Sequence, residues 1–155
     1  MDQVSLAQLH REISTARSAG VVHVLVRHAV RPPSADLITW LDSVLSDVGF
    51  RPLSGAWREV SRPDAVSVVQ NILHRDLAYR AEIMPAWLAA ELANRFCELF
   101  PESTRYFTNG TWETGPSGQP DQARTWSPLT EATFDAGVIA VTDGFVGVAW
   151  AEDED

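Results

Sequence analysis

Apolar residues recur at helical spacing in four stretches of the chain, and a serine or proline stands at the start of each. Ser5, Ser34 and Ser61 are suited to cap the first three stretches, and Pro85 fits the first turn of the fourth. Glycine or proline follows the first, second and fourth stretches, where it favours the end of a helix. The pattern predicts helices over residues 5–19, 34–49, 61–73 and 85–100.

Shorter apolar runs between these stretches have the composition or the period of strands. Residues 21–26 form a nearly continuous run rich in valine, which is typical of a buried strand. Residues 77–84 alternate between apolar and charged side chains, and a short strand is expected near residues 56–60. Strands are therefore expected between the helices.

The last third of the chain has the pattern of two hairpins. Asn109-Gly110 lies between residues 105–108 and 111–113, and Asp143-Gly144 lies between 137–141 and 145–150. Both dipeptides favour tight turns between antiparallel strands. The predicted fold class is α+β, a single domain over residues 1–155. Its four helices pack on one face of a largely antiparallel sheet, and the two hairpins and a short acidic tail (151–155) lie at the carboxyl end.

The predicted strand 145–150 is apolar on both faces, because Phe145 and Ala149 alternate with Val146, Val148 and Trp150. Either this strand is central and covered on both sides, or one of its faces meets a partner.

Composition places the chain among ordinary globular proteins. Of its 155 residues, 45% are hydrophobic and 21% are charged, and no apolar run approaches the ~18 residues of a membrane span. The first residues lack a basic start and an apolar stretch, so no secretory signal is expected. Cys97 is the only cysteine, which fits a reducing compartment, and a cytoplasmic location is expected.

The chain contains no lysine, since all twelve basic residues are arginine. This excludes Schiff-base chemistry, a phosphate-loop lysine and a lysine general base. The preference for arginine also suggests a GC-rich, bacterial source.

Negative charge is concentrated in the last fifty residues. Residues 1–105 have a charge balance of −1, whereas residues 106–155 have a balance of −8, out of a net charge of −9. Such a field repels nucleic acids and anionic membranes, and it attracts basic surfaces.

Two motifs that could indicate chemistry are incomplete. His74-Arg75-Asp76 is similar to the catalytic loop of protein kinases, but Ala81 stands where that family has a metal-binding asparagine, and the phosphate-binding motifs are missing. The four histidines lack the close spacing of a metal site, and Cys97 falls on an apolar helix face. No catalytic residue, metal or cofactor is predicted.

These observations favour a protein-binding module over an enzyme. The predicted partner is a basic protein, and one concrete form is an immunity-type inhibitor of a basic toxin or nuclease. Aromatic anchors inside an acidic rim would suit such a partner. The residues predicted to contact it are Trp112, Asp135, Trp150, Asp153 and Glu154.

Two alternatives remain open at this point. The first is a small enzyme or ligand-binding domain with a dispersed polar site around His28, His74, Asp76 and Arg80. The second is an accessory domain that oligomerises through the edges of its hairpins.

Overall fold

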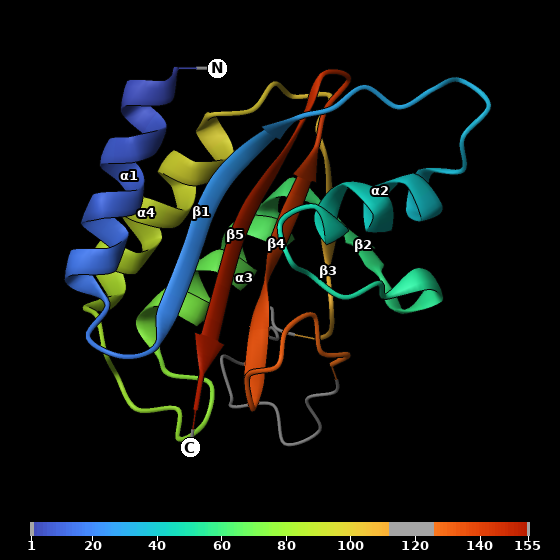
Figure 1. Cartoon of the computed structure of the whole chain (residues 1–155). Coiled ribbons are helices and arrows are strands. Elements are labelled where there is room, and N and C mark those ends of the chain that lie inside the picture. Colours follow the sequence, from blue (N-terminus) through green and yellow to red (C-terminus); the bar gives the residue numbers. More distant parts are fainter. Residues whose placement is uncertain (1, 112–125, 155) are drawn as a thin grey trace.

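The chain folds into a five-stranded antiparallel sheet with helices on both of its faces (Figure 1). The computed structural model describes residues 2–111 and 126–154. The strand order is β1-β5-β4-β3-β2. The strands are β1 (Val21–His28), β2 (Arg58–Val60), β3 (Arg105–Thr108), β4 (Phe134–Val141) and β5 (Phe145–Asp153). The helices are α1 (Gln3–Ala16), α2 (Leu37–Ser46), α3 (Arg62–His74) and α4 (Ala86–Glu98), with a short 3-10 turn at Ser54–Ala56.

This architecture confirms the predicted α+β class and the second of the two hairpins. Strands β4 and β5 pair along their whole length around the turn at Asp143-Gly144. The first predicted hairpin has most of its return strand, residues 111–113, outside the described residues. Strand β3 pairs with β2 on one side and with β4 on the other, so both of its edges are occupied.

Side-chain caps determine where three of the helices begin. Ser61 caps α3 as predicted, and its hydroxyl accepts the backbone N–H of Asp64. Helices α1 and α2 begin instead after Asp2 and Asp36, whose carboxylates accept backbone N–H groups of the first turn. An aspartate lies close to each predicted serine, and it caps a helix that starts two or three residues away from the predicted position.

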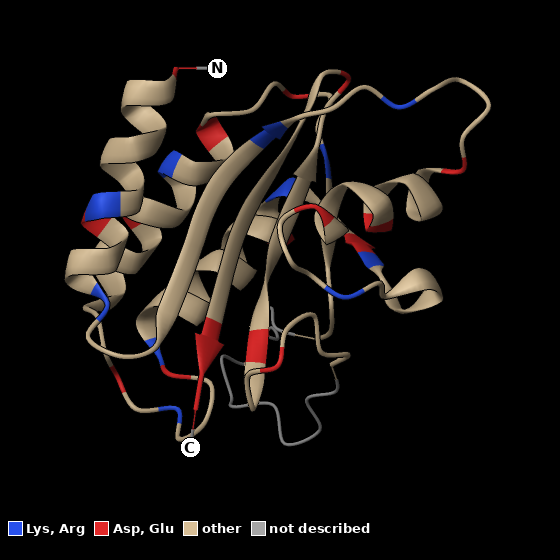
Figure 2. Ribbon diagram, viewed as in Figure 1, with Lys and Arg blue, Asp and Glu red and all other residues tan. Residues whose placement is uncertain are grey.

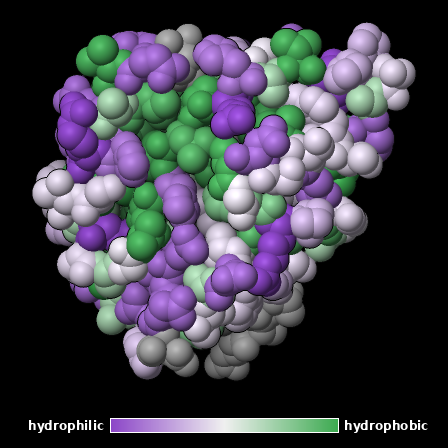
Figure 3. Space-filling model, viewed as in Figure 1, coloured by the Kyte–Doolittle hydropathy of each residue, from purple (hydrophilic) through white to green (hydrophobic). Residues whose placement is uncertain are grey.

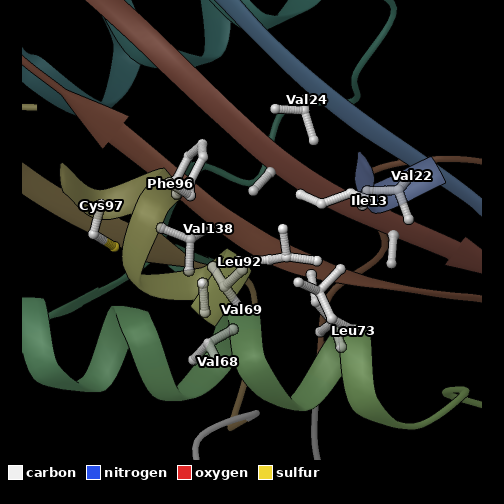
Figure 4. Close-up of a cluster of buried hydrophobic side chains, with 14 of the residues drawn as sticks. Ile13, Val22, Val24, Val68, Val69, Leu73, Leu92, Phe96, Cys97 and Val138 are labelled. Carbon is white, nitrogen blue, oxygen red and sulfur yellow. The ribbon is translucent and has the colours of Figure 1, made fainter. Parts of the chain in front are cut away.

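The rear face of the sheet is covered by α1, α3 and α4 (Figure 1). Val68, Val69 and Leu73 of α3 lie against Val138 of β4, and Phe96 of α4 extends the same apolar layer (Figure 4). Small residues of β4 and β5, among them alanines at alternate positions, allow these helices to approach the sheet closely. This layer is the larger of the two hydrophobic cores.

The front face is covered by α2 and by the segment that follows it (Figure 1). Leu41 and Leu45 of α2 pack over Val146, Val148 and Trp150 of β5. The expectation that the helices occupy one face only is therefore wrong. Strand β5 is central and covered on both sides, which explains why both of its faces are apolar.

Glycine is needed at position 147 because an aromatic ring lies directly on the strand. A Cβ atom there would come within 2.3 Å of the Phe100 ring. Phe100 in turn stacks near Phe96 and Phe145, with ring centroids 5.1 and 5.9 Å away. These contacts seat the carboxyl end of α4 on the sheet.

No helix within the two described ranges has the length and apolar character needed to cross a bilayer.

Candidate functional site at the carboxyl end of strand β5

Strand β5 ends where β4 begins and where β1 begins, so three segments meet at one end of the sheet. Figure 2 shows acidic residues gathered at the lower ends of β4 and β5. Four of the five predicted partner contacts lie here, namely Asp135, Trp150, Asp153 and Glu154. The fifth, Trp112, lies outside the described residues.

Asp135 is fully buried, and its carboxylate organises the loop before β4. It accepts the backbone N–H groups of Leu129 and Thr130 at 3.0 Å, and the Thr130 hydroxyl at 3.0 Å. The Asn109 amide and the Trp150 indole N–H donate to the same carboxylate at 3.1 and 3.2 Å. Because these donors satisfy the buried charge internally, Asp135 is not available as a surface contact.

Asp153 is also buried and forms an ion pair with the buried Arg17. The two guanidinium N–H groups donate to the two carboxylate oxygens at 2.8 and 2.7 Å. The backbone N–H of Leu77 donates to the same carboxylate at 2.7 Å. Asp153 therefore joins the end of α1, the end of β5 and the loop after α3, and its carboxylate is directed into the fold and away from solvent.

Trp150 is fully buried in the front core, between the rings of Phe50 and Trp57. Its indole N–H is used by Asp135. Trp150 is a predicted partner contact, and its ring is not exposed in this structure because α2 and the segment after it cover this face of the sheet.

Three glutamates at this end remain accessible, and we call them the acidic end: Glu131, Glu152 and Glu154. The side chain of Glu131 is 93% exposed and faces Arg51 at 3.6 Å. Glu152 is partly exposed and pairs with His23 across the β1–β5 ladder. Glu154 is exposed and accepts the hydroxyl and the backbone N–H of Thr133. Of the predicted contacts in the described residues, Glu154 alone has a side chain that a partner can reach.

The sequence carried a signal for the buried carboxylates. Asp135 stands inside the apolar run of β4, where a strand in mid-sheet has no solvent-facing side. A charge at such a position must find partners inside the fold. No local signal indicated Arg17, because its partner Asp153 lies 136 positions away.

The alternative polar site is not assembled. His28 lies at the end of β1 opposite Phe145, whereas His74, Asp76 and Arg80 lie beside the other end of β5. The eight residues of β1 separate the two groups by roughly 23 Å. The four side chains therefore do not converge on one substrate.

Residues 77–84 form a closed loop, and the strand predicted there is wrong. The Asp76 carboxylate accepts the backbone N–H groups of Tyr79 and Ala81 at 2.5 and 3.0 Å. Arg80 has a left-handed φ of 61°. The alternation of apolar and charged residues matched a strand, but the aspartate before it folds the backbone back on itself.

Cys97 is buried at the interface of α4 with the sheet, and burial raises the pKa of its thiol to about 11. A thiol in this state is neutral at physiological pH and is a poor nucleophile. Among the described residues, no group of three or more histidine, cysteine, aspartate or glutamate side chains is arranged to hold a metal ion.

A cavity of about 150 Å³ lies at the opposite end of the sheet from the acidic end. Arg31, Trp40, Arg105 and Asp143 line it. Arg105 already makes two 2.8 Å bonds to Glu59, and the Arg31 guanidinium donates to the Ala35 carbonyl. Its charged groups are largely engaged within the fold and do not form an acid–base pair.

No family model matches this chain, and no curated protein or solved structure matches it.

Proposed function

We propose that this chain is a non-catalytic protein-binding module that recognises a basic protein through its acidic end. In its most concrete form it is an immunity-type inhibitor of a basic toxin or nuclease, a small acidic protein that covers a cationic surface. The observation that carries the proposal is the gathering of Glu131, from the loop before β4, with Glu152 and Glu154, from the end of β5, at one end of the sheet.

Exposed carboxylates suit long-range attraction because they remain hydrated until the partner arrives. Glu131 and Glu154 lie at the surface, and neither is buried in an ion pair. Their attraction for a basic surface acts over about 8–10 Å at moderate salt. Its main effect is to raise the rate of association, with a smaller contribution to the affinity.

The Arg17–Asp153 pair and the Asp135 cluster support this role by fixing the surface that carries the glutamates. Asp153, the last residue of β5, lies between Glu152 and Glu154 in the sequence, and Asp135 holds the loop that includes Glu131. A rigid surface loses less conformational entropy on binding than a flexible tail would.

The separation of the candidate catalytic residues favours binding over catalysis. His28 is roughly 23 Å from the loop that carries Asp76 and Arg80, as judged from the length of β1. The Cys97 thiol is buried and neutral.

The first test is capture of the partner from native lysate at low and high salt, with identification by mass spectrometry. A single basic protein, retained at low salt and lost at high salt, is the expected result. Failure to retain any basic protein at low salt would count against the proposal.

The second test measures association of the captured protein with a triple variant, Glu131→Gln, Glu152→Gln and Glu154→Gln. The control removes the same charge elsewhere, through Asp47→Asn, Glu91→Gln and Glu102→Gln, all of which are exposed. We expect the first variant to slow association by about tenfold at low salt and to flatten its salt dependence, and the control to do much less. Equal effects of the two variants would show that only the net charge matters and that the acidic end is not the binding site.

A further inference from the structure

Strand β1 is an edge strand, and the direction of its backbone groups can be assigned. Its inner side pairs with β5, and Ala29, just beyond its end, donates to the Gly144 carbonyl on that side. On the outer side, the His10 ring bonds to the Val22 carbonyl at 3.3 Å. Backbone direction alternates along a strand, so the N–H and C=O groups of Val24, Val26 and His28 also point outward.

These outward groups are open. Within residues 2–111 and 126–154, no backbone or side-chain group bonds to the outer edge of Val24, Val26 or His28. Helix α1 bonds to the outer edge at Val22, through the His10 ring. The second half of β1 is thus a row of unpaired donors and acceptors of the kind that other strands add to.

Apolar surface adjoins this open edge. Val26 lies opposite Gly147, on which the Phe100 ring rests, and partly exposed Phe145 lies beside that ring. Leu99, also partly exposed, directly follows α4 and packs against the same core. Figure 3, which shows the opposite face of the sheet, has apolar side chains over the upper half of β1 as well. We call Val26, Leu99 and Phe145 the edge patch. A strand added at this edge would bury the apolar patch and would also pair the open backbone groups.

We propose that the occupant is β1 of a second copy of this chain, paired antiparallel in a register centred on Val26. In this register Val26 lies opposite Val26 of the second copy, and Val24 lies opposite His28. Each of these residues points its N–H and C=O outward, so every one of these pairs exchanges two hydrogen bonds. The pairing is therefore self-complementary.

The charges of the strand agree with a second copy and disagree with a basic strand. Arg27 would face Leu25 of the second copy and His28 would face Val24, so no like charges lie opposite each other. A basic strand would instead meet Arg27 and His28. The acidic ends lie beyond Val21, and the twofold axis directs them to opposite sides, roughly 30 Å apart, which exceeds the screening length at moderate salt.

The test is the mass in solution, measured by light scattering and sedimentation equilibrium over a hundredfold range of concentration. We expect the mass to rise from the 17.1 kDa of one chain towards twice that value. The amides of Val24, Val26 and His28 should become protected from hydrogen exchange over the same range. A chain that keeps the mass of one copy at every concentration would overturn the proposal.

Two substitutions locate the contact. Val26→Lys places a charge in the edge patch, and His28→Pro removes an outward donor while sparing the ladder to β5. Each should weaken self-association by at least tenfold. Val21→Lys is the matched control, because Val21 is 56% exposed on the same strand but lies beyond the paired segment.

Circular dichroism and the unfolding midpoint establish that each variant is folded. If Val26→Lys does not fold, the His28→Pro variant still tests the proposed contact, because position 28 is exposed. Dimers that persist in His28→Pro, or that Val21→Lys disrupts equally, would rule out this edge and this register.

Discussion

Two buried carboxylates, Asp135 and Asp153, each collect hydrogen-bond donors from segments that are distant in the sequence. Their donors include backbone N–H groups, whose positions are fixed by the fold. A charge placed in this manner costs desolvation energy that only a complete set of partners offsets. These residues therefore fix the geometry of the surface, and only the glutamates beside them face solvent.

Asp135→Asn should destabilise the protein strongly despite its small change in shape. The amide would direct an N–H group towards donors that now meet a carboxylate oxygen, so at least one buried polar group would lose its partner. We expect a loss of about 2–4 kcal/mol in the free energy of unfolding, measured by urea titration. Asp143→Asn, in the β4–β5 turn, should change it by no more than about 0.5 kcal/mol.

The buried thiol of Cys97 should make stability fall at alkaline pH. Burial raises its pKa to about 11, whereas an exposed thiol titrates near pH 8.5. Below the pKa of the thiol in the unfolded state, the contribution of Cys97 to the free energy of unfolding is fully present. This contribution is lost as the pH rises from the unfolded pKa through the folded pKa. Between pH 8 and pH 10 the free energy of unfolding should fall by about 1–2 kcal/mol.

The measurement is a series of urea titrations of the wild type and of Cys97→Ala. The variant should be less stable at pH 8, because it leaves a small cavity, but its stability should change less towards pH 10. Parallel slopes for the two proteins would show that another group causes the loss. Tyr106, whose pKa burial raises to about 12, begins to contribute near pH 10, where an exposed tyrosine titrates.

At the scale of elements, sequence predicts best where one interaction decides the boundary. Ser61 and Pro85 placed the starts of α3 and α4 correctly, and Asp143-Gly144 placed the turn between β4 and β5. Prediction failed for residues 77–84, where the Asp76 carboxylate bonds to backbone groups and overrides the alternating pattern.

The ion pair between Arg17 and Asp153 connects the end of α1 with the end of β5, and Asp153 also bonds to the loop after α3. Asp153→Ala leaves the Arg17 guanidinium and the Leu77 N–H buried without their acceptor. We expect a loss of about 3–5 kcal/mol and faster hydrogen exchange of the loop amides. The double variant Arg17→Met and Asp153→Leu removes the buried charge as well as its partner, so it should be more stable than Asp153→Ala. The opposite order would mean that the pair itself contributes most of the stability.

For the whole molecule, the sequence predicted the sign and the region of the charge more reliably than the residues that display it. The last fifty residues are acidic, and their described part does form an acidic end. Which acids face solvent depends on long-range contacts, such as that of Asp153 with Arg17, which have no local pattern. The covering of both sheet faces, and with it the burial of Trp150, likewise depends on where α2 folds back.

A net charge of −9, much of it at one end, should destabilise the fold by self-repulsion at low salt. Raising the salt from about 0.01 to about 0.15 M shortens the screening length from about 30 to about 8 Å. The exposed ion pairs Arg95–Glu12 and Arg105–Glu59 lose little on screening, because such pairs contribute at most about 1 kcal/mol. Relief of repulsion should therefore prevail and raise the thermal midpoint by roughly 2–4 °C.

The two triple variants separate local from global repulsion. Glu131, Glu152 and Glu154 lie close enough together to repel one another within a screening length. Among the control residues, Asp47 directly follows α2, Glu91 lies within α4, and Glu102 lies in the loop between α4 and β3. Neutralising the acidic end should raise the low-salt midpoint more, and should reduce its response to salt more, than neutralising the dispersed set. A midpoint that falls with salt in the wild type would mean that attraction between opposite charges outweighs repulsion, and that the acidic end is balanced by nearby arginines such as Arg51.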